Sequence, residues 1–136
     1  MSLPILPLLD NFGRRHNNLR LSVTDRCNIR CFYCMPAEHV KFLPRHELLS
    51  FEEIERAVRI LVAVGVDKLR LTGGEPLVRA DIDQLVQKLK SIPQIREVAM
   101  TTNAVSLALY AKRLKQAGLD RLNISLDALQ RETFVA

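Results

Sequence analysis

The sequence of 136 residues contains no tryptophan, and its aromatic residues are only five phenylalanines and two tyrosines. Proteins that bind nucleic acid commonly stack bases on exposed aromatic side chains, and few are available here. We therefore expect no nucleic-acid partner. The net charge of +5 would instead suit an acidic small molecule, although many basic residues fall on expected helix faces, where ordinary solvation explains them.

A long hydrophobic run is also missing. Residues 1–10 are apolar, but this segment is too short to span a membrane, has no basic start and contains Pro4 and Pro7. We therefore expect a cytoplasmic protein without a membrane partner. The composition is typical of one soluble domain, which we divide into an N-terminal extension over residues 1–14 and a core over residues 15–136.

Cysteine is scarce, and the three that occur lie within eight residues, at Cys27, Cys31 and Cys34. Without an export signal, this pattern favours metal ligation over a disulfide framework. Iron-sulfur clusters normally take four cysteines, so three would leave one iron open to another ligand. The alternative is a zinc site completed by His39 or His46.

Hydrophobic periodicity predicts four strands that alternate with three helices. Strands are expected at 19–24, 68–72, 98–102 and 121–126, and helices at about 51–65, 81–90 and 106–117. The first helix opens with Ser50 and Glu53, which can form a capping box. This alternation predicts an α/β fold with a parallel sheet and right-handed crossovers.

The expected strands have one apolar and one polar face. The apolar positions are Leu19, Leu21, Val23, Leu69, Leu71, Leu122, Ile124 and Leu126. The polar face carries Arg20 and Arg70, and burying an arginine without a partner is costly. We therefore expect a curved sheet with helices outside and a polar cavity that admits an ionic ligand. A merely solvated face, or ion pairs with Glu75 or Asp127, are the alternatives.

Each expected strand ends in a polar motif. The cysteine loop follows the first, Gly73-Gly74-Glu75-Pro76 the second, Thr101-Thr102-Asn103 the third and Ser125-Leu126-Asp127 the fourth. The carboxyl ends of parallel strands meet at one edge, where α/β folds bind ligands. The four motifs therefore predict one shared site.

With these motifs, the chain resembles the radical S-adenosylmethionine (SAM) superfamily, whose hallmark is the C-x3-C-x2-C spacing with an aromatic residue before the last cysteine, here Tyr33. The resemblance implies a parallel-sheet partial (β/α) barrel, truncated here after about four strands. It also implies a [4Fe-4S] cluster on Cys27, Cys31 and Cys34 whose open iron chelates S-adenosylmethionine. An electron donor such as a flavodoxin or ferredoxin would reduce the cluster, and cleavage of the sulfonium bond would release a 5'-deoxyadenosyl radical.

Within that superfamily, the sequence from about Arg15 onward is similar to the GTP 3',8-cyclase (MoaA) family of molybdenum cofactor biosynthesis. The resemblance implies that the radical removes a hydrogen from the ribose C3' of GTP, and that C3' then attacks C8 of guanine. The matching positions are Tyr33, Gly74 and Ser125 for S-adenosylmethionine, and Arg20, Arg70 and Thr101 for GTP. No catalytic residue is assigned.

Two departures from the family pattern affect these expectations. Ala104 stands where the family usually has glycine, and we expect a locally adjusted turn there. Family members also continue beyond Ala136 through two further strand-helix units and a region with a second cluster. We therefore interpret the chain as an N-terminal portion that should not cyclise GTP alone, and we leave homodimerisation open.

Two other functions stay open at this point. Another radical SAM enzyme that modifies a peptide or RNA would share the cluster motif, although Arg20 and Arg70 together favour a nucleotide substrate. A non-enzymatic, zinc-stabilised interaction module would use the same cysteines for structure alone.

Overall fold

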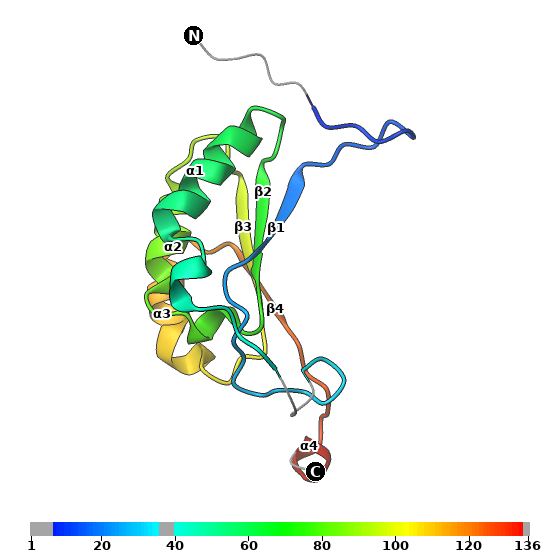
Figure 1. Ribbon diagram of the computed structural model, residues 1–136, viewed down its shortest axis with the longest axis vertical. Coiled ribbons are helices and arrows are strands. Elements are labelled where there is room, and N and C mark those ends of the chain that lie inside the picture. Colours follow the sequence, from blue (N-terminus) through cyan, green and yellow to red (C-terminus); the bar gives the residue numbers. More distant parts are fainter. Residues whose placement is uncertain (1–6, 36–39, 135–136) are drawn as a thin grey trace.

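The computed structural model describes residues 7–35 and 40–134, which form an α/β fold around one parallel sheet (Figure 1). The strands are β1 (Asn18–Ser22), β2 (Lys68–Thr72), β3 (Glu97–Thr102) and β4 (Arg121–Ile124), paired in that order. The helices are α1 (Phe51–Val62), α2 (Ile82–Lys90), α3 (Leu107–Ala117) and α4 (Arg131–Phe134), with short 3-10 turns η1 (Arg45–Glu47) and η2 (Pro76–Val78). The predicted fold class and element order are confirmed.

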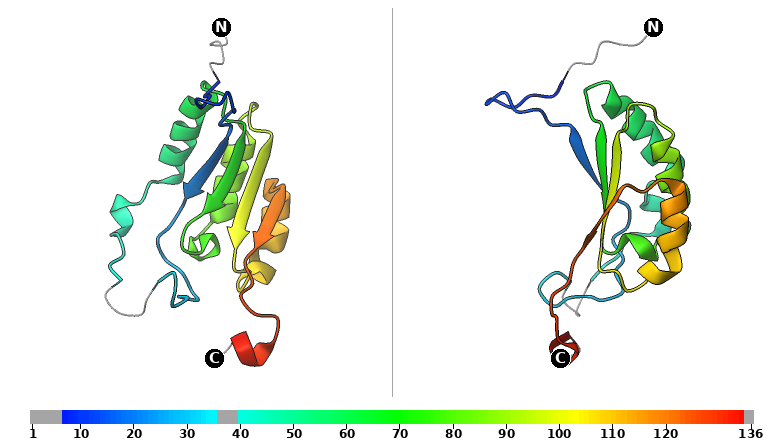
Figure 2. Two further views of the ribbon diagram at one scale, coloured as in Figure 1. Left: turned by 90° about the vertical axis from the view of Figure 1, so that its right-hand side faces the viewer. Right: turned by 180° about the vertical axis from the view of Figure 1, so that it is seen from behind.

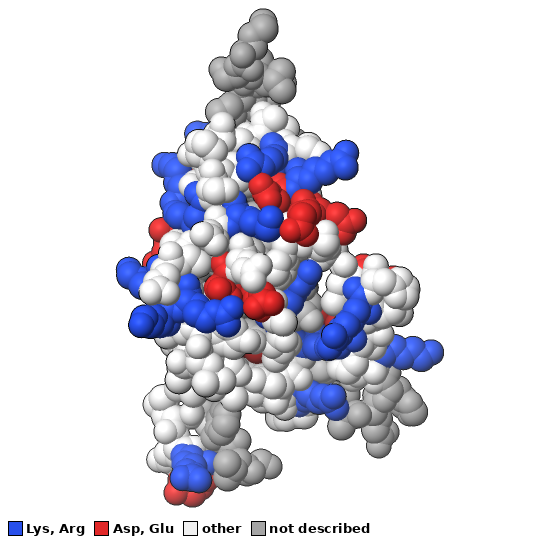
Figure 3. Space-filling model, turned by 90° about the vertical axis from the view of Figure 1, so that its left-hand side faces the viewer, with Lys and Arg blue, Asp and Glu red and all other residues white. Residues whose placement is uncertain are grey.

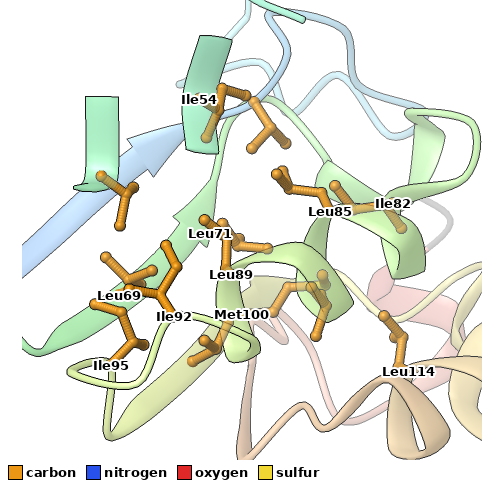
Figure 4. Close-up of a cluster of buried hydrophobic side chains, with 14 of the residues drawn as sticks. Ile54, Leu69, Leu71, Ile82, Leu85, Leu89, Ile92, Ile95, Met100 and Leu114 are labelled. Carbon is orange, nitrogen blue, oxygen red and sulfur yellow. The ribbon is translucent and has the colours of Figure 1, made fainter. Parts of the chain in front are cut away.

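Helices α1, α2 and α3 cover one face of the sheet and leave the other without a helix (Figure 2). Each helix turns an apolar stripe toward the strands because its apolar residues recur every three or four positions. The core is shown in Figure 4 and includes Ile54, Val58, Ile82, Leu85, Leu89 and Leu114 of the helices against Leu69, Leu71, Val98 and Met100 of the strands. No helix in the described ranges has both the length and the apolarity needed to cross a membrane.

The start of α1 forms the predicted capping box. The Ser50 hydroxyl accepts a hydrogen bond from the Glu53 backbone N–H at 3.2 Å, and the Glu53 carboxylate accepts one from the Ser50 N–H at 2.7 Å. Two backbone donors at the helix end are thereby satisfied, and such a cap stabilises a helix by about 1 kcal/mol.

The strand register aligns three arginines across the open face of the sheet. Arg20 pairs with Arg70 between β1 and β2, Arg70 with Ala99 between β2 and β3, and Ala99 with Arg121 between β3 and β4. The Arg121 guanidinium donates to the Glu97 carboxylate at 2.8 Å, so this arginine is already paired. We call Arg20, Arg70 and Arg121 the arginine row.

The predicted apolar face is only partly covered at the end of the fourth strand. Leu122 is half-buried, but Ile124 is 56% exposed and Leu126 is 60% exposed. The strand also ends at Ile124 instead of Leu126. Alternation alone assigns a residue to a face, whereas burial needs a second layer over that face, and the described residues cover this corner incompletely.

The helical face carries mixed charges (Figure 3). Arg59 pairs with Glu55 at 2.7 Å, and Lys88 reaches Glu52 at 3.2 Å. Exposed pairs of this kind contribute little to stability, because water and salt screen both partners. The basic residues of these helices are therefore ordinary solvated surface, as the sequence predicts.

Residues 8–16 fold back on themselves before the start of β1. Leu9 and Arg15 form an antiparallel bridge, and the Leu8 N–H donates to the Val64 carbonyl at 3.1 Å. The expected boundary between residues 14 and 15 stays a prediction.

The turn after β3 keeps a left-handed residue at Ala104, whose φ is +63°. The expectation of a locally adjusted turn is therefore wrong. The turn is held from both sides, because the Ala104 N–H donates to the Thr102 hydroxyl at 3.0 Å and its carbonyl accepts from the Leu107 N–H at 3.0 Å. These hydrogen bonds hold alanine in a conformation that glycine adopts without strain.

Replacing Ala104 with glycine should raise the free energy of unfolding by about 0.5–1 kcal/mol, because the strain removed exceeds the added entropy of the unfolded chain. Urea unfolding followed by circular dichroism measures the change. Ala99→Gly, in the middle of buried strand β3, is the matched control and should lower stability by a similar amount. A destabilised Ala104→Gly variant would contradict strain at this turn.

Candidate cofactor and substrate site

The loops that follow the four strands gather at one end of the sheet (Figure 2) and line one pocket. Seven of the residues assigned from the sequence line it: Cys27, Cys31, Tyr33, Cys34, Gly74, Thr101 and Ser125. Its other lining residues were assigned no cofactor or substrate contact from the sequence: Ile29, Arg30, Met35, Glu75, Thr102, Asn103 and Asp127. The predicted convergence of the four motifs is confirmed, whereas the ligand that each residue contacts stays a prediction.

The three cysteines are free thiols on a compact loop. A turn brings Cys31 and Cys34 together, because the Cys31 carbonyl accepts hydrogen bonds from the N–H groups of Cys34 at 2.9 Å and Met35 at 2.8 Å. Among the described residues, no three His, Cys, Asp or Glu side chains lie close enough to hold a single metal ion. A [4Fe-4S] cluster is larger, since each thiolate binds a different iron, and three thiols around one pocket fit it.

The two glycines after β2 allow a close approach between backbones. The Gly74 N–H donates to the Thr24 carbonyl at 2.8 Å, and the next N–H donates to the Arg26 carbonyl at 2.8 Å. A Cβ atom at Gly73 would collide with the Thr24 carbonyl, and one at Gly74 with the Arg26 carbonyl. The two glycines thus allow the chain that leads into the cysteine loop to pack against the end of β2, and Gly74 also lines the pocket.

Glu75 joins the loops that follow β2 and β3, and it is only 1% exposed. One carboxylate oxygen accepts from the Thr102 hydroxyl at 2.6 Å and from the Leu77 N–H at 3.1 Å. The other accepts from the Asn103 N–H at 2.7 Å. Buried carboxylates require such donors, so Glu75 fixes the ends of β2 and β3 relative to each other. Its position beside Gly74 was the only sequence signal for this role.

Asp127 contacts the opposite side of the cysteine loop. The Tyr33 hydroxyl donates to its carboxylate, with 2.8 Å to each oxygen, and the Cys31 sulfur lies 3.6 Å from Oδ2. The hydrogen bond to Asp127 raises the pKa of the Tyr33 phenol well above its usual value. Tyr33 therefore stays protonated at neutral pH and remains a hydrogen-bond donor.

Arg79 connects three segments of the chain on the outer side of the site. Its guanidinium donates to the Val23 carbonyl at 2.6 Å and to the Leu49 carbonyl at 2.5 Å, and it stacks on the Phe51 ring at 4.5 Å. Partial burial lowers the pKa of this guanidinium. One side chain thus links η2, the end of β1 and the start of α1.

Arg20 and Arg70 do not line the pocket, but they lie on the same sheet face as Thr101, which does. Arg70 is paired with Ala99, and Thr101 follows Ala99 by two residues on the same face. Because a strand rises about 3.3 Å per residue, the arginine row lies about 7 Å from the level of Thr101.

The alternative ion pairs of these arginines are not formed. In the part of the chain that the structure describes, neither Arg20 nor Arg70 makes a salt bridge, and Glu75 and Asp127 accept other hydrogen bonds. Arg20 is exposed and Arg70 is half-buried. Arg20 and Arg70 lie in register on adjacent strands, and guanidinium groups without carboxylate partners could donate hydrogen bonds to a multiply charged anion.

The family of the chain follows from a match over most of its length. The family model described as the radical SAM superfamily matches residues 21–135. The chain belongs to the radical SAM superfamily. A [4Fe-4S] cluster and S-adenosylmethionine are the cofactors that membership implies, and Cys27, Cys31 and Cys34 could hold the cluster.

Curated relatives extend the comparison. The chain is 54% identical over 131 residues to a GTP 3',8-cyclase of Rhodopirellula baltica, covering 96% of this chain and 36% of that protein. It is 52% identical over 129 residues to a GTP 3',8-cyclase of Listeria monocytogenes, covering 95% of this chain and 39% of that protein. It is also 53% identical over 128 residues to molybdenum cofactor biosynthesis protein 1 of Drosophila melanogaster, covering 94% of this chain and 23% of that protein. The chain thus spans less than half the length of these relatives.

A solved structure supports the fold. The crystal structure of BtrN in complex with AdoMet and 2-DOIA aligns with a TM-score of 0.60 over 88% of this chain and 50% of that chain, at 17% sequence identity. This likeness concerns the fold, and it agrees with a partial barrel of the radical SAM type.

The zinc alternative finds little support at this site. His46 is exposed and lies 4.0 Å from Glu47, and it is absent from the pocket lining. His39 lies outside the described residues. The superfamily match instead favours iron and sulfide on the three thiols.

Proposed function

We propose that this chain provides the cluster and S-adenosylmethionine site of a GTP 3',8-cyclase, which forms 3',8-cyclo-7,8-dihydro-GTP in molybdenum cofactor biosynthesis. The main support is one juxtaposition: three free cysteines line a pocket beside two arginines that have no acidic partner among the described residues. The identity of more than 50% to proteins named GTP 3',8-cyclase agrees with it.

The cofactors and the protein have separate tasks in this proposal. When bound, the reduced cluster supplies one electron that cleaves the sulfonium bond of S-adenosylmethionine and yields a 5'-deoxyadenosyl radical. Cys27, Cys31 and Cys34 hold the cluster, and Tyr33, Gly74 and Ser125 contact S-adenosylmethionine. Ser125 is well placed for this task, because its N–H donates to the Thr102 carbonyl at 2.9 Å and extends the β3–β4 pairing into the pocket.

The open face of the sheet would bind GTP. Arg20 and Arg70 donate charge-assisted hydrogen bonds to the triphosphate, and Thr101 contacts the nucleotide where this face meets the pocket. The strand spacing places the two arginines only about 7 Å from the level of Thr101. The sugar can therefore lie toward the pocket while the phosphates contact the arginines. No residue of this chain is assigned to proton transfer.

The electron comes from outside the chain in this proposal. A one-electron donor such as a flavodoxin or ferredoxin would approach the exposed cysteine loop, where Cys34 is exposed and Phe32 is 86% exposed. We also propose a cytoplasmic location, because labile clusters of this type need a reducing compartment.

The experiment is anaerobic reconstitution of the chain with iron and sulfide, followed by thermal unfolding with GTP, ATP or a peptide. A ligand that binds only the folded state raises the unfolding temperature. GTP should give the largest shift, and addition of S-adenosylmethionine with dithionite should release 5'-deoxyadenosine. Equal shifts by GTP and ATP, or a shift by the peptide alone, would contradict a GTP 3',8-cyclase and favour another radical SAM enzyme.

Replacing Arg70 with alanine should weaken GTP binding about tenfold or more, because a hydrogen bond to a charged group contributes about 1.5–3 kcal/mol. Isothermal titration calorimetry on the reconstituted chain measures the affinity. Arg121→Ala is the matched control in the same arginine row, since Arg121 is paired with Glu97, and it should change the affinity less than threefold. Equal losses in both variants would indicate a general charge effect.

A further inference from the structure

Asn103 lies between the buried Glu75 and the first cysteine. Its backbone N–H donates to the Glu75 carboxylate at 2.7 Å, and its side-chain nitrogen Nδ2 lies 4.0 Å from the Cys27 sulfur. The same nitrogen donates to the Asn28 carbonyl oxygen Oδ1 at 2.8 Å. This side chain thus crosses from the end of β3 to the first two residues of the cysteine loop.

The orientation of the Asn103 amide follows from its hydrogen bonds. Its oxygen Oδ1 accepts from the Val105 N–H at 3.1 Å, so its NH2 group must face Asn28 and Cys27. One of the two amide hydrogens is used by Asn28, and the other remains for the sulfur. Glu75 holds the backbone of Asn103, so this direction is fixed from inside the protein.

We propose that Asn103 donates an N–H···S hydrogen bond to Cys27 and thereby raises the reduction potential of the cluster, with Glu75 holding Asn103 in position. The inference rests on the proposed cluster site. One-electron reduction adds negative charge to the cluster and its sulfur ligands, and a donor dipole aimed at a sulfur stabilises that charge. Asn103 is therefore a positioning residue that tunes the electron acceptor, and the electron itself comes from an external donor.

The test is a redox titration of the reconstituted chain with dithionite, followed by electron paramagnetic resonance. Asn103→Ser removes the amide donor without adding charge. Asn103→Asp also removes it, but its carboxylate still accepts from the Val105 N–H and preserves the turn. We expect a lower midpoint potential in both, with a reduction equilibrium constant about tenfold smaller, which is about 59 mV for one electron.

Asn28→Ala is the matched control, because it removes the competing acceptor and leaves the Asn103 amide facing Cys27. Its midpoint potential should lie at or above that of the wild type. A lower potential in Asn28→Ala, equal to that of Asn103→Ser, would overturn the inference, since the loop geometry would then set the potential.

Three further results would also overturn it. An unchanged potential in Asn103→Ser would mean that no hydrogen bond reaches the sulfur, and a shift in Asn103→Asp alone would be a charge effect. Loss of the cluster from either Asn103 variant, but not from Asn28→Ala, would assign Asn103 a structural role instead. A wild-type chain that binds no [4Fe-4S] cluster would reject the proposed function itself, before any variant is compared.

Discussion

Replacing Glu75 with alanine should lower the free energy of unfolding by about 3 kcal/mol, because it leaves three inward-facing donors without an acceptor. Those donors are the Thr102 hydroxyl and the N–H groups of Leu77 and Asn103. The loop after β3 would also lose its attachment to the loop after β2. We therefore expect the variant to bind the cluster poorly, and urea unfolding followed by circular dichroism measures its stability.

Glu75→Gln separates the charge from the shape of this side chain. Its amide NH2 group would face at least one N–H donor, so we expect a loss of about 1–3 kcal/mol. The control is Glu47→Ala, a largely exposed glutamate, which should change stability by no more than about 0.5 kcal/mol. Wild-type stability in Glu75→Gln would show that the three hydrogen bonds of Glu75 do not hold the site together.

Replacing any one of Cys27, Cys31 or Cys34 with alanine should abolish the [4Fe-4S] cluster. The chain contains no fourth cysteine, so no other thiol can replace the missing ligand. Each variant should stay folded, because none of the three side chains belongs to the buried core. Anaerobic reconstitution with iron and sulfide, followed by absorbance and electron paramagnetic resonance of the reduced protein, measures the cluster.

Phe32→Ala is the control for general damage to the cysteine loop. Phe32 lies between two of the cysteines and is 86% exposed, so its removal should leave the cluster content unchanged. Full cluster content in Cys34→Ala would remove Cys34 from the ligand set. A wild-type protein that stays colourless after reconstitution and binds zinc instead would favour a structural metal site.

Local sequence patterns predicted the elements of the fold. The capping box at Ser50 marked the start of α1, and the strand predicted at residues 68–72 is β2. These features depend on neighbours within a few positions, so they are visible without the tertiary structure. The fourth strand was less well predicted, because the burial of Ile124 depends on what covers it.

The sequence also predicted which residues meet at the candidate site, but not all of their contacts. The cysteine spacing and the polar strand ends indicated which residues would meet, since parallel strands end at one edge of a sheet. Neither pattern indicated what the glycines approach. Gly73 and Gly74 meet the backbone of Thr24 and Arg26, which lie nearly fifty residues earlier in the chain.

By itself, the sequence determined the α/β class, the order of its strands and helices, the three cysteines and the superfamily they indicate. Only the tertiary structure decided that Arg20 pairs in register with Arg70, that Glu75 joins two strand ends and that Asn103 faces Cys27. The physical reason is that strand period assigns a residue to a face but leaves the register between strands open. Contacts between residues far apart in the chain exist only after the helices and strands have packed against one another.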